Sequence, residues 1–139
     1  MRPTTAIAPL HLMLGLLLLF CQGCGEDFPS GALKGHVTVD GQPLEVGTIH
    51  FTPLEGGRGP TVSVEIGADG QYQIDKVPLG KNRVVFLAIK ETGKMLRDKD
   101  MNIDYPETVS LIAPKFHLQG IEVEIVSGTT DQDFQLTSK

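Results

Sequence analysis

Residues 35–53, GHVTVDGQPLEVGTIHFTP, decide the fold. Val37 and Val39 alternate with polar residues in the first half, and the TIHFT run alternates in the same way in the second half. A period of two residues is typical of strands that bury one face. Between the two runs, Asp40 and Gly41 tolerate positive φ and predict a reversal of the chain. The pattern leaves open whether the two strands pair with each other or lie in different sheets.

The same alternation returns along the rest of the chain. It predicts further strands within residues 61–66, 71–75, 82–90, 109–116, 121–126 and 132–137. We expect 61–66 and 71–75 to form a second hairpin. With turn signals about every ten residues and no helical period after residue 24, the sequence predicts an all-β fold, an antiparallel seven-stranded β-sandwich.

Two segments of this sandwich have special roles in the prediction. Strand 82–90 carries VVFLAI, which is apolar on both faces, so it is expected to be central or covered on its outer face. Residues 91–106 show no regular pattern, and we expect them to form an irregular flap over that face. Pro114 interrupts the strand expected within 109–116, which places that strand at an edge.

Composition limits the class of protein. The 139 residues are 40% hydrophobic and 21% charged, which is ordinary for one folded domain. The formal net charge is −5, and no cluster of lysine and arginine is present of the kind that nucleic-acid recognition needs. A nucleic-acid partner is therefore not expected.

The N-terminus has the features of an export signal. Arg2 is followed by an uncharged stretch and then by the apolar run LMLGLLLLF at residues 12–20. A run of this length is too short to span a bilayer as a helix, which takes about 20 residues. A positive start, a short apolar core and small residues before a cleavage position indicate a secretory signal peptide.

The sequence after this apolar run, FCQGCG, resembles a bacterial lipobox. Gly23 before Cys24 supplies the small residue that the motif requires before the lipidated cysteine, whereas Cys21 stands where leucine is usual. The resemblance implies lipidation at Cys24, with a diacylglycerol thioether and an amide-linked chain such as palmitate. Two or more acyl chains hold a protein stably on a membrane. The alternatives are an ordinary cleaved signal with a secreted product and an uncleaved anchor; a Cys21–Cys24 metal or redox pair lacks any further cysteine.

These features divide the chain into three parts. Residues 1–23 are the predicted lipoprotein signal peptide, 24–31 a tether and 32–139 the β-sandwich domain. Loss of Arg2 with the signal takes the formal charge from −5 to −6. By the sorting rule for bacterial lipoproteins, Gly25 in place of an aspartate implies the outer membrane, facing the periplasm or the exterior.

Four motifs of the domain carry a resemblance to a known family. They are GHVTVDGQPLEVGTIHFTP, then ADGQYQI, then VPLGKNRVVF, and finally APKF followed by GIEVEIVSGTTDQDFQL. In this order they resemble the carboxypeptidase regulatory-like, transthyretin-like domain of small bacterial lipoproteins. The resemblance covers nearly the whole predicted mature chain. It implies a seven-stranded, prealbumin-like sandwich without catalytic residues, which serves in binding, spacing or support of folding.

The sequence contains none of the usual catalytic motifs. It has no GxSxG elbow, no HExxH, no GxxxxGK[ST] phosphate loop and no dinucleotide-binding strand–glycine–helix motif. We therefore expect no enzymatic activity, no catalytic residues and no cofactor.

Two groups of residues have the chemistry of weak metal sites. His36 and His50 would meet if the two strands of residues 35–53 paired in the right register, although a third ligand is missing. The run DKDMNID places oxygen ligands at every second position. Those ligands, Asp98, Asp100, Asn102 and Asp104, resemble part of a calcium loop, but Ile103 and Val109 stand where an EF-hand needs Gly and Glu.

Three hypotheses on function follow. The first is an exported, lipid-anchored, non-enzymatic β-sandwich with a structural or protein-interaction role at the cell envelope, its partners being the membrane and an envelope protein. The second is a domain that binds carbohydrate or another small ligand through a sheet face or the 91–106 flap, with Tyr105 as its one expected exposed aromatic ring. The third is an envelope module whose stability depends on calcium.

Overall fold

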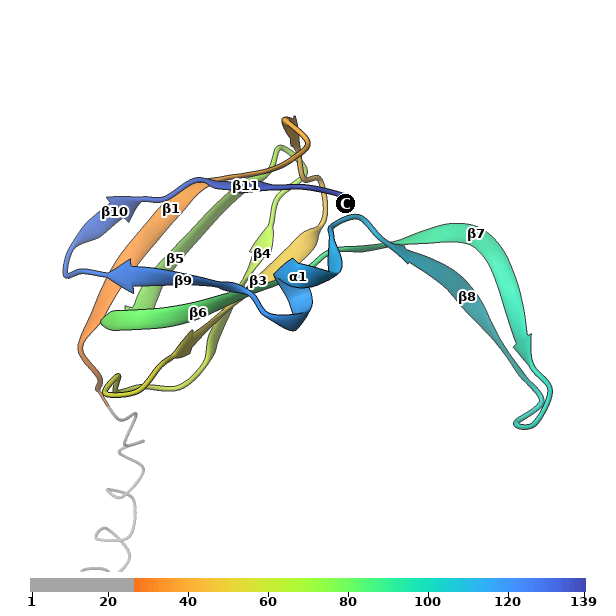
Figure 1. Ribbon diagram of the computed structural model, residues 1–139, viewed down its shortest axis with the longest axis horizontal. Coiled ribbons are helices and arrows are strands. Elements are labelled where there is room, and N and C mark those ends of the chain that lie inside the picture. The colour runs from red at the N-terminus through yellow and green to blue at the C-terminus, as the bar shows by residue number, and fades with distance from the viewer. Residues whose placement is uncertain (1–26) are drawn as a thin grey trace, which may run out of the picture.

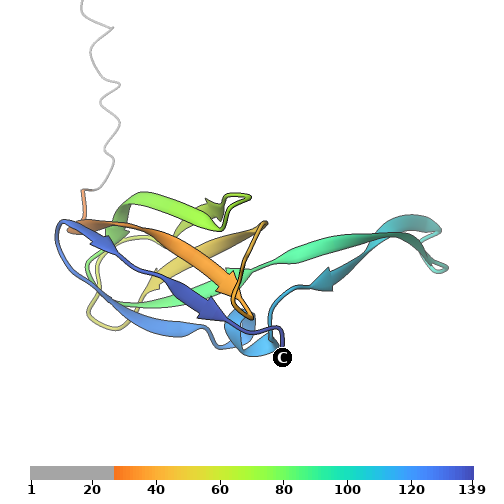
Figure 2. The same cartoon turned by 90° about the horizontal axis from the view of Figure 1, so that it is seen from above.

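The computed structural model describes residues 27–139, which form eleven strands and one short helix. The predicted all-β class is confirmed. A five-stranded and a four-stranded sheet face each other across one hydrophobic core, and a two-stranded sheet projects from one end (Figures 1 and 2).

The five-stranded sheet is built around its longest strand, β1 (Ser30–Val39). The other members are β2 (Gln42–Pro43), β5 (Gln71–Pro78), β10 (Thr129–Asp131) and β11 (Phe134–Leu136). β2 and β5 pair with β1 antiparallel, whereas β10 and β11 pair with it in parallel. The prediction of a purely antiparallel sandwich is therefore wrong, because the C-terminal segment crosses from the opposite sheet instead of turning back along β1.

The four-stranded sheet is antiparallel throughout. Its order is β4 (Val62–Ile66), β3 (Gly47–Pro53), β6 (Gly80–Leu87) and β9 (Ile121–Ile125). β6 lies between two neighbours, as its apolar sequence predicts. β1 begins at Ser30, two residues before the expected start of the domain.

The two strands of residues 35–53 lie in different sheets. Asp40 and Gly41 have φ of 50° and 84°, and they close a two-residue turn from β1 into the short β2. The chain then passes to β3 in the facing sheet. The expected second hairpin is also wrong, because β4 and β5 belong to different sheets as well. Alternation requires only that each strand has a buried face, and here both sheets bury theirs against the same core.

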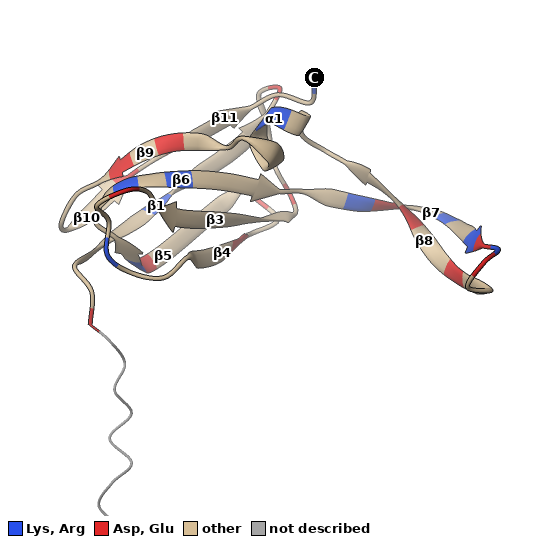
Figure 3. Ribbon diagram, turned by 60° about the horizontal axis from the view of Figure 1, so that its bottom comes forward, with Lys and Arg blue, Asp and Glu red and all other residues tan. Residues whose placement is uncertain are grey.

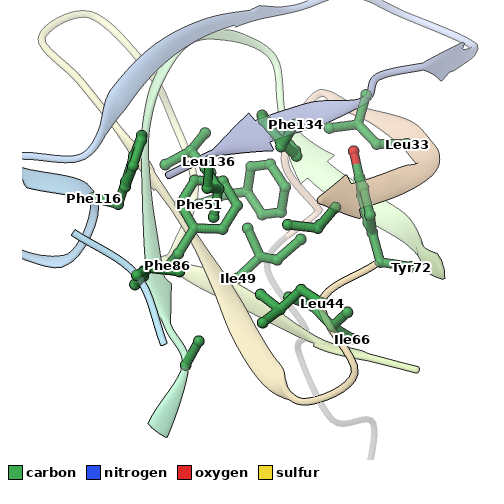
Figure 4. Close-up of a cluster of buried hydrophobic side chains, with 14 of the residues drawn as sticks. Leu33, Leu44, Ile49, Phe51, Ile66, Tyr72, Phe86, Phe116, Phe134 and Leu136 are labelled. Carbon is green, nitrogen blue, oxygen red and sulfur yellow. The ribbon is translucent and has the colours of Figure 1, made fainter. Parts of the chain in front are cut away.

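Aromatic rings join the two sheets. The ring of Phe134 on β11 lies 5.0 Å from that of Phe86 on β6 and 5.7 Å from that of Tyr72 on β5. Phe116 meets Phe86 edge-on at 6.5 Å. Figure 4 shows these rings among the aliphatic side chains between the sheets. Edge-on and tilted pairs of this kind contribute about 0.5–1.5 kcal/mol each beyond their burial.

Two predicted segments have a different structure from the one expected. Residues 91–106 form no flap over β6; most of them belong to a hairpin of β7 (Ile89–Asp98) and β8 (Ile103–Ser110) that projects from the sandwich (Figure 1). The edge strand expected within 109–116 is also wrong, because β8 ends at Ser110 and α1 (Pro114–Leu118) follows. Proline is favoured at the first turn of a helix, where its missing N–H is not needed.

The passage from β10 to β11 is held by Tyr72. Its hydroxyl donates to the carbonyl oxygen of Gln132 at 2.6 Å, between the two parallel strands. Burial, together with the negative charge of Asp133, raises the pKa of Tyr72 above its usual value. The folded state therefore keeps this phenol neutral.

The substitution Tyr72→Phe tests this contact. We expect it to cost about 1–2 kcal/mol of unfolding free energy, because Gln132 loses its donor. Since the pKa of Tyr72 is higher in the folded state, the unfolded chain releases the proton first, and stability should fall as pH rises above about 10. Denaturant unfolding between about pH 8 and pH 11 should show this fall in the wild type and in the exposed control Tyr105→Phe. An equal fall of the unfolding free energy in Tyr72→Phe would contradict the assignment of this pH dependence to Tyr72.

Candidate functional site

The projecting hairpin is the feature of the fold that the core does not require. We call residues 89–110, with strands β7 and β8, the arm. Within the described part of the chain, these two strands pair only with each other. Pairing runs from Ile89 opposite Ser110 at the base to Asp98 opposite Ile103 at the tip, with a shift of register between Glu91 and Met95.

Polar side chains close the tip of the arm. A carboxylate oxygen of Asp98 accepts hydrogen bonds from the backbone N–H groups of Asp100 and Met101, at 2.9 and 3.0 Å. Arg97 donates to Asp104 at 3.3 Å and also to Asn102, whose φ is 54°. Aspartate and asparagine favour such turns because their side chains bond the backbone nearby.

This tip contains the residues predicted as a weak calcium site. The contacts just described use Asp98, Asn102 and Asp104 to close the turn and to pair with Arg97. Within residues 27–139, no group of three or more histidine, cysteine or acidic side chains is close enough to hold a metal ion. The contacts of these side chains close the turn, and a calcium site at the tip stays a prediction.

The two histidines of the other weak metal site lie in different sheets. His36 is on β1, where its ring nitrogen is 3.7 Å from a carboxylate oxygen of Asp133. His50 is on β3, and its Nδ1 is hydrogen-bonded to the hydroxyl of Ser63 at 2.7 Å. The predicted paired-histidine site is therefore wrong, because it required the first two strands to pair.

Exposed apolar side chains gather on the arm. Among the described residues, seven of the eleven exposed large hydrophobic residues belong to it: Ile89, Met95, Leu96, Met101, Ile103, Tyr105 and Val109. Met95 and Met101 are 63% and 67% exposed. Contiguous exposed apolar surface usually marks a site of interaction.

Four of these residues share one side of the arm. Ile103, Tyr105 and Val109 are at alternate positions of β8 and point the same way. Leu96 is directly opposite Tyr105, so its side chain lies on the same side. We call these four residues the arm face.

The edges of the arm are protected against further strands. Native proteins block free strand edges with lysine, proline and irregular pairing. β7 carries Lys90 and Lys94 and the shift of register, with Gly93 at φ of 82°, and β8 carries Pro106. Figure 3 shows residues of both charges interleaved along the two strands. A partner is therefore expected to contact the faces of the arm and not to extend its sheet.

A second surface of interest is polar. A shallow hollow of about 620 Å³ lies along the solvent side of β1 and β5. Its polar lining residues include Lys34, His36, Gln71, Gln73, Asp131 and Asp133. Lys34 is 3.5 Å from Asp131, and the backbone N–H of His36 donates to Asp133 at 2.8 Å. The ring of Tyr72 is buried beneath this surface, so it offers no aromatic platform.

The predicted lipidation site, Cys24, lies outside the described residues, as do the signal peptide and the first residues of the tether. Within residues 27–139, no helix is long and apolar enough to cross a membrane. The described chain begins at the end of the sandwich opposite to the arm (Figures 1 and 2).

Comparison with known proteins gives only distant similarities. No protein-family model matches the chain, and no curated protein matches it. A solved DUF3823 family protein from Parabacteroides merdae ATCC 43184 is similar with a TM-score of 0.44 and 20% identity. That match covers 81% of this chain and 48% of the other, so this chain spans about half its length.

Two further solved structures are similar over most of this chain. One is a protein from Pseudomonas aeruginosa proposed to bind carbohydrate, with a TM-score of 0.40, 12% identity, and coverage of 81% of this chain and 90% of that one. The other is a 9R-lipoxygenase from Cyanothece PCC8801, with a TM-score of 0.36, 14% identity, and coverage of 78% and 16%. Scores this low carry no conclusion about function, and membership of the carboxypeptidase regulatory-like family stays a prediction.

Proposed function

We propose that this chain is a lipid-anchored, non-enzymatic protein of the cell envelope whose arm docks another protein. The observation that carries the proposal is the arm itself, a two-stranded ribbon that projects from the sandwich with apolar side chains exposed. An isolated two-stranded ribbon is at best marginally stable in water. Contact with a partner would bury the exposed apolar residues and add stability.

The residue types on the arm support this role. Aromatic residues and methionine are enriched in protein interfaces, and the exposed residues of the arm include Tyr105, Met95 and Met101. The contacts at the tip hold the turn, and the blocked edges discourage uncontrolled strand addition. Both features suit an element that has to avoid aggregation while it is not bound to its partner.

The position of the arm supports anchoring through Cys24. Residue 27 is three residues after that cysteine, at the opposite end of the sandwich from the arm (Figure 1). A lipid attached at Cys24 would hold this end near the membrane and direct the arm away from it. The outer membrane is the proposed location, following the sorting rule that Gly25 satisfies.

Docking through the arm is tested by crosslinking in cells. A photoreactive benzoylphenylalanine at position 105 should form a covalent adduct with a protein, because Tyr105 lies on the arm face. The matched control places the same residue at Glu122, which is exposed on β9. Equal yields at the two positions, or no protein adduct at position 105, would refute docking through the arm.

Anchoring is tested by fractionation of membranes. The Cys24→Ala chain should move from the membrane to the soluble envelope fraction, because the acyl chains supply the anchor. Cys21→Ala is the matched control and should stay on the membrane. Mass spectrometry of the wild type should find an acylated Cys24 at the mature N-terminus. Membrane retention of Cys24→Ala would contradict the proposal.

Carbohydrate binding is the second candidate, and the polar hollow beside β1 favours it. The carboxylates, amides and ammonium group that line the hollow suit hydrogen bonding to sugar hydroxyls. A glycan array should then show binding that the double substitution Gln71→Ala and Gln73→Ala weakens at least about tenfold, equal to about 1.4 kcal/mol. Arg83→Ala on the other sheet is the control. Absence of glycan binding, or equal binding by both variants, would exclude this candidate.

A further inference from the structure

An apolar hollow lies at the base of the arm. It has a volume of about 450 Å³, and its walls come from the end of β1, from β2, from the passage to β3, and from Lys90 and Leu111 at the base of the arm. The residues that matter here are Val39, Pro43, Leu44, Val46, Lys90 and Leu111. A hollow of this size takes several side chains, since pockets for small ligands begin at about 300 Å³.

The hollow opens on the same side of the molecule as the arm face. Lys90, in its wall, is paired directly with Val109 of the arm face, so the two side chains point the same way. The arm face therefore extends from the hollow along one side of the arm toward Ile103 near the tip, with the carboxylate residue Glu107 between Tyr105 and Val109.

The tip of the arm has the shape and chemistry that such a hollow accepts. Met101 is the most exposed large hydrophobic residue of the arm, at 67%, and the flexible side chain of methionine fills irregular apolar spaces well. Met101 follows Lys99 and Asp100, while the hollow is lined by Glu45 and Lys90. Lys99 at the tip can therefore pair with Glu45 at the hollow, and Asp100 with Lys90.

We propose that the protein docked by the arm is a second copy of this chain, with each arm tip seated in the apolar hollow of the other copy. This inference rests on the proposed function and names its partner. In a two-fold dimer the two arms run antiparallel. The same symmetry that seats one arm tip in the partner's hollow also seats the partner's tip in the hollow of the first copy. The two arm faces then pack against each other along the strands, about 30 Å in length.

The contact is self-complementary, and this allows a test by mixing two variants. Val46→Asp puts a charge into the hollow, and Met101→Lys puts the opposite charge on the tip. Each variant alone should dimerise at least about tenfold more weakly, a change of about 1.4 kcal/mol, because a charge faces apolar groups. Mixed together they should dimerise again, since one contact gains a Lys–Asp pair and the other is unchanged.

Sedimentation equilibrium of the purified full chain measures these associations. The control Val126→Asp changes an exposed apolar residue outside the arm and should leave the wild-type association unchanged. A monomeric wild type at all concentrations would overturn the proposal. Failure of the mixture to associate while the wild type dimerises would do the same.

Crosslinking with benzoylphenylalanine at position 101 separates this inference from the proposed function. A covalent dimer whose crosslinked peptide contains residues 39–46 or 111 supports the second copy. An adduct with a different protein overturns the second copy but leaves docking through the arm in place. No protein adduct at positions 101 or 105 would remove both.

Discussion

The close approach of β1 to the C-terminal segment is the constraint on which the rest of the sandwich depends. A Cβ atom on Gly35 would lie 2.1 Å from the carbonyl oxygen of Gln132, so only glycine fits there. At this point β1 changes partner from β10 to β11. The backbone N–H of Gln132 donates to Lys34, and the hydroxyl of Tyr72 donates to Gln132. These bonds place Phe134 between the two sheets, where it contacts Phe86 and Tyr72.

The sequence predicts the strands of the sandwich better than their partners. Alternation locates β1, β3, β4 and β9 because each buries one face. It cannot choose between pairing within a hairpin and packing across the core, since both bury the same face. The parallel strands β10 and β11 depend on contacts between residues about 100 positions apart, such as the bond from His36 to Asp133. No local pattern carries that information.

The strands of the arm are not predicted, because neither face of the arm is buried. Both of its faces are exposed, so β7 shows no two-residue period of polar and apolar residues, and Gly93 and Pro106 have the composition of a loop. The available signal was the tip: Arg97 and Asp104 flank a run rich in turn-forming residues. The alternate carboxylates there suggested a calcium site, whereas the structure uses Asp98 to bind backbone N–H groups.

The first described residues and the arm lie at opposite ends of the sandwich (Figure 1). Aromatic contacts join the two sheets of the sandwich between them. The arm is less constrained, because it lies outside the core and pairs only with itself among the described residues. Segments with few buried apolar contacts open at a lower free energy than the core, which suits a docking element.

Hydrogen exchange of the backbone amides of residues 89–110, followed as a function of protein concentration, tests this account most directly. In dilute solution these amides should exchange faster than those of β1 and β6, because the arm is exposed and marginally stable. At high concentration they should slow down while the sandwich stays unchanged. If the amides of the arm were as protected as those of β6 at every concentration, the arm would not be an element that is stabilised by a partner, and the proposed docking role would be contradicted.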